Sequence, residues 1–154
     1  MGLNNNKSIH KISFMKMLDN GHVLVKKKEY EKGILWYEKV IKIYPKWAGP
    51  YLHKGIALLK LSRYYEAICY FDKSLKTGTK LGCPIQVGTQ YNKGRALYHL
   101  TRYNEALCCY DKAYAGLLIG SPLKSLNSKG LASRIFILKA KTSVLKKLKV
   151  GKRK

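Results

Sequence analysis

Acidic residues are scarce in this chain of 154 residues: eight Asp and Glu stand against 31 Lys and Arg, a formal net charge of +23. A domain usually carries a net charge of about 2–8 in magnitude. Such an excess of positive charge favours acidic or polyanionic partners. Apolar residues make up 46% of the chain, which is ordinary for a packed core and excludes wholesale disorder.

Long hydrophobic runs are missing as well. No run of about 18 apolar residues occurs, so no transmembrane helix is expected. Lysine and histidine interrupt every apolar stretch near the N-terminus, which argues against a secretory signal. The four cysteines, Cys69, Cys83, Cys108 and Cys109, form no C-x-x-C pair. These features predict reduced thiols and a cytoplasmic location.

Motifs that carry chemistry are absent too. Neither glycine-rich phosphate-binding motif occurs, so nucleotide binding has no support. The histidines, His10, His22, His53 and His99, form no H-x-x-x-H pair, and no cysteine has zinc-ligand spacing. We therefore expect no metal or other cofactor.

What the chain does contain is a repeat. Residues 54–74 align without a gap on residues 93–113, at an offset of 39, and a weaker copy precedes the first of these by 34 residues. Small residues recur in phase in each of the two helical stretches of a copy. They are Gly21, Gly55 and Gly94 in the first stretch, and Gly33, Ala67 and Ala106 in the second. Small residues in one phase predict close packing of the two helices at that point.

The period and the recurring positions resemble the tetratricopeptide repeat, a helical hairpin of about 34 residues. The resemblance implies an all-α fold, a right-handed α-solenoid of stacked antiparallel helix hairpins with a concave face. We expect three repeats over 14–120, at 14–47, 48–80 and 87–120, with an inserted loop at 81–86. Residues 1–13 form an N-terminal segment whose order the sequence leaves open.

Residues 121–154 are predicted to form a partial fourth repeat, or capping helix, followed by a basic tail. Lys129-Gly130 occupies the Lys-Gly position of the earlier copies. Helical spacing continues through Ile135, Leu138, Thr142, Leu145 and Leu148.

Five of the eight carboxylates also recur with the repeat: Glu66 with Glu105, and Glu38 with Asp72 and Asp111. A residue that recurs with the repeat serves the repeat, so we expect no catalytic role and no enzyme. Glu38 with Lys42, and Asp72 with Lys76, also have the spacing of i,i+4 ion pairs within one helix.

In the tetratricopeptide family, ligands lie against the first helix of each repeat. The resemblance therefore places a peptide-binding groove that is apolar at one end and aromatic and basic at the other. Such a groove suits an extended or helical peptide with apolar anchors and an acidic segment. For Leu52 and Ile56, packing against neighbouring helices is an equal alternative. The predicted groove residues are Leu18, His22, Leu52, Ile56, Tyr91, Asn92, Arg95, Tyr98, His99, Asn127 and Arg134.

Some family members hold a peptide's terminal carboxylate in a clamp of Lys, Asn and Arg. In one frame only Asn92 fits the clamp pattern, and shifting the frame by one repeat adds only Lys124. A terminal carboxylate clamp is therefore not expected. The first frame places Leu18, His22, His53, Gly88 and Asn92 at the clamp positions.

Positive charge is concentrated at the C-terminal end, since residues 112–154 hold 12 basic residues and no acidic one. The expected polyanion contacts are Lys146, Lys147, Lys149, Lys152, Arg153 and Lys154. The sequence thus favours a non-enzymatic adaptor or scaffold for an acidic protein or peptide partner, acting as a monomer or weak homodimer. The alternative is a nucleic-acid- or ribosome-associated protein that binds polyanions non-specifically through this tail.

Overall fold

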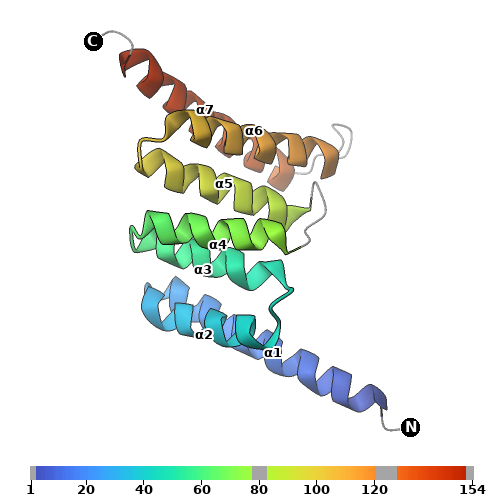
Figure 1. Cartoon of the computed structure of the whole chain (residues 1–154). Coiled ribbons are helices and arrows are strands. Elements are labelled where there is room, and N and C mark those ends of the chain that lie inside the picture. The colour runs from blue at the N-terminus through green and yellow to red at the C-terminus, as the bar shows by residue number, and fades with distance from the viewer. Residues whose placement is uncertain (1–2, 78–82, 121–127, 152–154) are drawn as a thin grey trace.

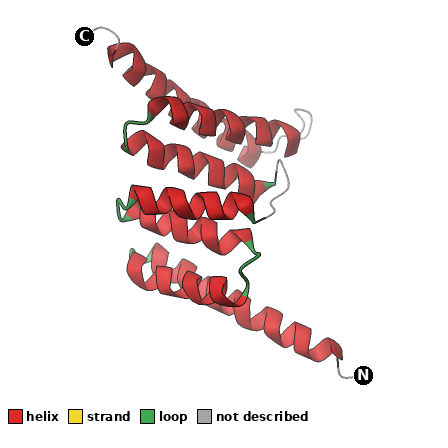
Figure 2. Ribbon diagram, in the orientation of Figure 1, coloured by secondary structure: helices red, strands yellow, loops and turns green. Residues whose placement is uncertain are grey.

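A computed structural model describes residues 3–77, 83–120 and 128–151 of the chain, and almost all of them are helical. The helices are α1 (Leu3–Lys26), α2 (Tyr30–Ile43), α3 (Ala48–Lys60), α4 (Tyr64–Lys76), α5 (Pro84–His99), α6 (Tyr103–Gly120) and α7 (Ser128–Gly151). They stack in chain order, so the two termini lie at opposite ends of the molecule (Figure 1). Helices and short connections account for the described residues (Figure 2), which confirms the predicted all-α solenoid.

The same turn closes each of the first three hairpins. Lys28, Ser62 and Thr101 have positive φ angles of 65°, 61° and 59°. After each of them, a backbone N–H donates to a carbonyl five residues earlier in the preceding helix. These bonds join Glu29 to Leu24, Arg63 to Leu58 and Arg102 to Leu97, at 2.9–3.0 Å. A left-handed residue after the last helical turn satisfies carbonyls that would otherwise lack a donor.

A glycine and an aromatic ring mark the closest approach within each hairpin. Gly55 in α3 lies against Phe71 in α4, so close that a Cβ atom there would lie 2.5 Å from Phe71 Cε1. Gly21 meets Tyr37, and Gly94 meets Tyr110, in the same way. The predicted close packing at the recurring glycines is therefore present in all three hairpins.

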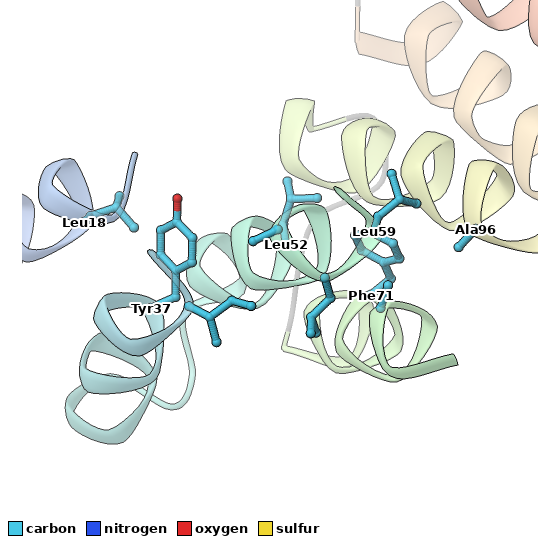
Figure 3. Packing of buried hydrophobic residues seen from close by; sticks show 10 residues of the cluster. Leu18, Tyr37, Leu52, Leu59, Phe71 and Ala96 are labelled. Atoms are coloured by element: carbon cyan, nitrogen blue, oxygen red, sulfur yellow. The ribbon is translucent and has the colours of Figure 1, made fainter. Parts of the chain in front are cut away.

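Buried residues form two clusters along the stack. The first joins α1 to α4 and reaches α5 at Ala96, as Leu18, Tyr37, Leu52, Leu59, Phe71 and Ala96 show in Figure 3. The second joins α5, α6 and α7 through Leu97, Tyr110, Ile137 and Val144. Ile68 of α4 packs against both clusters, so the two cores are continuous.

A lysine and a carboxylate pair across each junction between hairpins. Lys54 of α3 donates to Glu38 of α2 at 2.5 Å, and Lys93 of α5 donates to Asp72 of α4 at 2.5 Å. Lys141 of α7 pairs with Asp111 of α6. The recurring carboxylates thus join one hairpin to the next. The structure shows this contact where the sequence indicated i,i+4 pairs of Glu38 and Asp72 within their own helices.

Two element boundaries differ from the expected ones. Helix α5 begins at Pro84, inside the predicted loop 81–86, because Pro84 takes the first helical position and Cys83 Sγ accepts a hydrogen bond from the Gln86 N–H. Helix α1 extends back to Leu3, into the segment whose order was left open. Among the described helices, none is long and apolar enough to cross a membrane.

Helix α7 is aligned to the repeat differently from the prediction, and it buries a different face. Its inward face carries Arg134, Ile137 and Val144, all buried, and the ion pair of Lys141 holds that face against α6. The pairing with Asp111 therefore places Lys141, rather than Lys129, in the position that Lys54 and Lys93 occupy in the earlier repeats.

Candidate functional site

The apolar end of the predicted groove lies largely in the core. Leu18 and Leu52 are 8% and 7% exposed and belong to the first buried cluster. Ile56 is half-buried and packs against the same cluster. The burial of Leu52 favours the packing alternative. Leu18 is equally buried, so both side chains fill the space between adjacent helices and leave little surface for a ligand.

Two histidines lie where the first two hairpins meet. The rings of His22 in α1 and His53 in α3 make an edge contact with centroids 4.3 Å apart, and Tyr37 stacks on His53 at 5.8 Å. Burial lowers the pKa of His53 to about 4, and the neighbouring His22 acts in the same direction. Burial also lowers the pKa of His22, although Asp19 opposes this. Both imidazoles are therefore neutral at pH 7 and supply no positive charge to a carboxylate.

A concave site, which we call the tyrosine pocket, lies at the position predicted for the aromatic and basic end of the groove. It has a volume of about 200 Å³ and lies between α5 and α7, with one residue from α6. Four predicted groove residues come together in it. The tyrosine pocket is lined by Tyr91, Arg95, Tyr98, His99, Tyr110, Ala140 and Ser143.

Arg95 is held in place inside the tyrosine pocket. Its Nη1 donates to Asn92 Oδ1 at 3.1 Å, and Asn92 Nδ2 in turn donates to the Gly88 carbonyl at 2.8 Å. Asn92 is buried and Arg95 is only half-buried, so the guanidinium keeps donors for a ligand. A side chain that is already ordered loses less conformational entropy when it binds.

The tyrosines around Arg95 brace one another. Tyr91 contacts Tyr110 with ring centroids 5.8 Å apart, and Tyr98 contacts Tyr103 at 5.6 Å. Ser143 Oγ of α7 donates to the Tyr98 hydroxyl at 3.4 Å. Burial raises the pKa of Tyr110, so its hydroxyl remains protonated. The site therefore combines aromatic rings, hydroxyl groups and the guanidinium of Arg95.

Three residues of the tyrosine pocket were missed from the sequence. Tyr110 recurs in phase with Tyr37 and Phe71, and each of these rings packs against the glycine of its own hairpin. Ala140 and Ser143 lie on α7, where the predicted frame placed Asn127 and Arg134 in the groove. Arg134 is buried on the inward face of α7, and Asn127 lies outside the described residues. Pairing the recurring carboxylate Asp111 with Lys141, instead of aligning Lys129-Gly130 to the repeat, predicts the observed alignment of α7.

A second concavity of about 340 Å³ surrounds Lys54, with Glu31, Glu38, Glu66 and Arg63 among its lining residues. Lys54 is buried, and its Nζ lies 3.9 Å from the centre of the Tyr70 ring as well as 2.5 Å from Glu38. Lys54 pairs with Glu38 and Arg63 pairs with Glu66, so these groups serve the junction between hairpins and give this concavity a structural role. Within residues 3–77, 83–120 and 128–151, no three His, Cys, Asp or Glu side chains cluster closely enough to hold a metal ion.

The predicted polyanion contacts fall partly on α7. Lys146, Lys147 and Lys149 are exposed there. Lys152, Arg153 and Lys154 lie outside the described residues.

Comparison with known proteins connects this geometry to a fold. The family model of the tetratricopeptide repeat matches residues 21–46. The complex of the TPR2B domain of yeast Sti1 with pHsp70 superposes with a TM-score of 0.74 at 20% identity, covering 88% of this chain and 98% of that one. The chain has the fold of a tetratricopeptide-repeat solenoid, with about three and a half repeats. A search of curated protein sequences finds no match.

Two further tetratricopeptide domains have similar folds. The Sgt2 domain from Aspergillus fumigatus has a TM-score of 0.74 at 16% identity, covering 92% of this chain and 83% of that one. The first TPR of Spaghetti (RPAP3), bound to the HSP90 peptide SRMEEVD, has a TM-score of 0.61 at 16% identity, covering 82% and 91%. At these identities the likeness establishes the fold. The tetratricopeptide-repeat arrangement makes α1, α3, α5 and α7 the first helices of their repeats.

Proposed function

We propose that this tetratricopeptide-repeat chain is a non-enzymatic interaction module that binds an acidic or amphipathic peptide segment against its first helices. The observation that carries the proposal is the tyrosine pocket, where half-buried Arg95 is oriented by Asn92 among tyrosine rings. Tyrosine and arginine are among the side chains that are enriched at the energetic centres of protein interfaces.

The size of the tyrosine pocket supports a peptide ligand. Pockets for small molecules usually have volumes of about 300–1,000 Å³, whereas this one has about 200 Å³. It therefore fits one side chain of a longer ligand, with the rest of that ligand lying along the neighbouring helices.

Charge supports an acidic ligand. The net charge of +23 raises the rate at which an acidic segment meets the surface, and Arg95 supplies a directional partner for a carboxylate. The peptides bound to Spaghetti and to the second TPR domain of human RPAP3, SRMEEVD and SGPTIEEVD, both contain paired glutamates. The clamp positions here hold neutral His22 and His53, so we expect recognition of side-chain carboxylates rather than of a chain terminus.

Peptide selection tests this proposal. Peptides selected from a random display library against the full chain should carry Asp or Glu beside a bulky apolar residue. Arg95→Ala should weaken the selected peptide about tenfold or more, because a hydrogen bond to a charged group contributes about 1.5–3 kcal/mol. Tyr98→Ala should weaken it as well.

Arg102→Ala is the matched control for Arg95→Ala, since Arg102 is exposed on the turn after α5 and pairs with Glu105 at 2.6 Å. Circular dichroism should show unchanged helicity in each variant. Equal losses of affinity for the two arginine variants, or selected peptides without acidic residues, contradict the proposal.

A second candidate function is non-specific polyanion binding by the C-terminal basic segment, as in a nucleic-acid- or ribosome-associated protein. The exposure of Lys146, Lys147 and Lys149 on α7 supports it. Binding to a homopolymer RNA should then fall steeply with salt, and Lys146→Gln with Lys147→Gln should weaken it. Deleting residues 139–154 is a poorer test, because Val144 and Lys141 hold α7 in place. Affinity that does not change with salt rules this candidate out.

A further inference from the structure

One side of α7 leaves a stripe of apolar side chains in solvent. Ile135, Leu138 and Leu145 are 43%, 46% and 43% exposed. On a helix with about 3.6 residues per turn, these three residues and Thr142 lie within about 80° of one another. We call the stripe of Ile135, Leu138, Thr142 and Leu145 the outward face of α7. Single exposed apolar residues are common on proteins, whereas a contiguous stripe of them marks an interaction surface.

The packing of α7 against α5 and α6 keeps this face in solvent. Ile137 and Val144 are buried in the second cluster, and Lys141 pairs with Asp111 of α6. These contacts fix the rotation of α7 about its axis. The outward face therefore cannot turn into the core of the solenoid without breaking them.

The earlier repeats show that the same positions are normally covered. The lysine–carboxylate pairs between hairpins align α7 with α3 and α5. In this alignment Leu145 corresponds to Leu58 and Leu97, which are both 1% exposed. The leucine that is buried in two repeats is therefore open to solvent in the fourth.

The element that covers the equivalent glycines in those repeats is the second helix. Thr142 corresponds to Gly55 and Gly94 in the same alignment. Phe71 of α4 packs against the first of these glycines, and Tyr110 of α6 packs against the second. Helix α7 is the last helix of the described stack (Figure 1), so no described helix covers it in this way. The geometry of the other hairpins thus indicates that a helix fits the outward face.

Charge indicates which helix. Lys139 and Lys146 border the outward face, and Lys149 follows Leu145 by about one turn on the same side; all three are exposed. A second copy of this chain is disfavoured, because residues 112–154 hold 12 basic residues and no acidic one. Acidic side chains beside the apolar stripe of a partner helix are complementary to these lysines.

We propose that the outward face of α7 binds an amphipathic helix of a partner protein, with acidic residues flanking the apolar stripe of that helix. The bound helix takes the place of a second helix and completes the fourth hairpin. Its apolar side chains, spaced three and four residues apart, contact Ile135, Leu138 and Leu145. Ala140 and Ser143, which line the tyrosine pocket, lie on another side of α7. The failure of this proposal therefore leaves the function proposed above standing.

Fluorescence anisotropy with designed peptides tests the proposal on the full chain. The probe is a peptide of about five helical turns, with leucines spaced three and four residues apart and glutamates on both flanks of that stripe. One control peptide has lysine in place of each glutamate, and another has the same composition in scrambled order. The glutamate peptide should bind and gain helicity, which circular dichroism measures. The lysine peptide should bind about tenfold more weakly or less, and the scrambled peptide should not bind.

Variants of α7 locate the peptide. Leu138→Gln with Leu145→Gln should weaken the glutamate peptide about tenfold or more, because apolar burial is lost. Phe136→Gln with Val150→Gln is the matched control, since those residues are 62% and 63% exposed on α7 but lie outside the outward face. This control should leave the affinity unchanged, and circular dichroism should show the same helicity in both variants.

Three results overturn the proposal. The first is that no peptide binds, or that the scrambled or lysine peptide binds as well as the glutamate peptide. The second is that the glutamate peptide keeps its affinity for the Leu138/Leu145 variant, which places it elsewhere on the chain. The third comes from sedimentation equilibrium without peptide: if the natural chain dimerises and the Leu138/Leu145 variant does not, a second copy covers the outward face.

Discussion

Phe71 is fully buried and lies against a glycine that no other residue can replace without displacing the ring. A Cβ atom at position 55 would lie 2.5 Å from Phe71 Cε1 and 2.7 Å from Cδ1, distances that real Cβ contacts do not show. Gly88, in the next hairpin, has only Leu52 Cδ2 near it, at an ordinary 3.7 Å. The two glycines therefore have opposite roles in stability, although both lie within helices.

We expect Gly55→Ala to destabilise the fold by about 1–3 kcal/mol, because Phe71 has no free space to move into. Gly88→Ala should stabilise it by about 0.5–1 kcal/mol, because alanine restricts the unfolded chain and meets no steric conflict here. Guanidinium unfolding followed by circular dichroism measures both changes. Shifts of the same sign in the two variants would contradict the account of hairpin packing.

His53 should make stability depend on pH. An unfolded chain protonates this imidazole near pH 6.5, whereas the folded chain resists protonation until about pH 4. The free energy of unfolding should therefore be highest above pH 6.5 and should fall by about 2 kcal/mol between pH 6.5 and 4, allowing for the part exposure of the ring.

Denaturant unfolding at several pH values measures this dependence. His53→Gln should remove most of the slope between pH 6.5 and 4, since an amide does not titrate. A slope of equal size in the variant and the natural chain would assign the pH dependence to other groups.

At the scale of single residues, the packing of positions that recur in each repeat could be predicted from the sequence. The packing of positions that do not recur could not. The glycine phase was visible because three copies share it, and the structure shows why it recurs. The burial of Leu18 was not predicted, and for Leu52 the sequence left packing and ligand contact as equal alternatives. A first helix has one face toward ligands and another toward its neighbours, and spacing alone does not distinguish them. The contact of His22 with His53 depends on how two hairpins stack, which no local pattern encodes.

At the scale of the element, α7 shows how much two adjacent residues can differ in exposure and therefore in their contribution to stability. Ile137 is 3% exposed and packs in the second cluster, whereas Leu138 is 46% exposed on the outward face. We expect Ile137→Ala to destabilise the fold by about 2–4 kcal/mol. Leu138→Ala should change stability by less than about 0.5 kcal/mol.

Guanidinium unfolding compares the two variants directly, with amide exchange in α7 as the local readout. Similar losses of stability in the two variants would mean that α7 also packs through the face that carries Leu138.

The frame of α7 illustrates why sequence alone predicted the helix but not its packing. The spacing of Ile135, Leu138 and Leu145 correctly indicates a helix, yet these residues lie on the exposed face. The contact that selects the inward face is the ion pair of Lys141 with Asp111, which joins residues 30 positions apart. Lys129-Gly130 matches the Lys-Gly pair of the earlier repeats, so similarity of sequence aligned α7 to the repeat at Lys129. The ion pair shows that Lys141 takes that position.

At the scale of the whole molecule, the net charge of +23 should dominate the response to salt. Like charges at this density repel one another in the compact state, and salt shortens the range of that repulsion to about 8–10 Å near physiological ionic strength. We expect the melting temperature to rise as sodium chloride increases from about 0.01 to 0.15 M, by about 2–4 °C for each kcal/mol of repulsion relieved.

Differential scanning calorimetry in sodium chloride measures this shift. Sodium chloride is preferable to sulfate, which stabilises folded proteins by exclusion from their surface. A melting temperature that falls with salt would mean that exposed ion pairs such as Arg102 with Glu105 outweigh the general repulsion.

The lysine–carboxylate pairs between hairpins also bear on how such a chain can change in length. Lys54 with Glu38, Lys93 with Asp72 and Lys141 with Asp111 present the same chemistry at successive junctions. When a hairpin is duplicated or deleted, the hairpins that become adjacent already carry a lysine and a carboxylate that can pair. The length of solenoid available to a ligand can therefore change by one hairpin in a single duplication or deletion, and no new residues are needed at the junction.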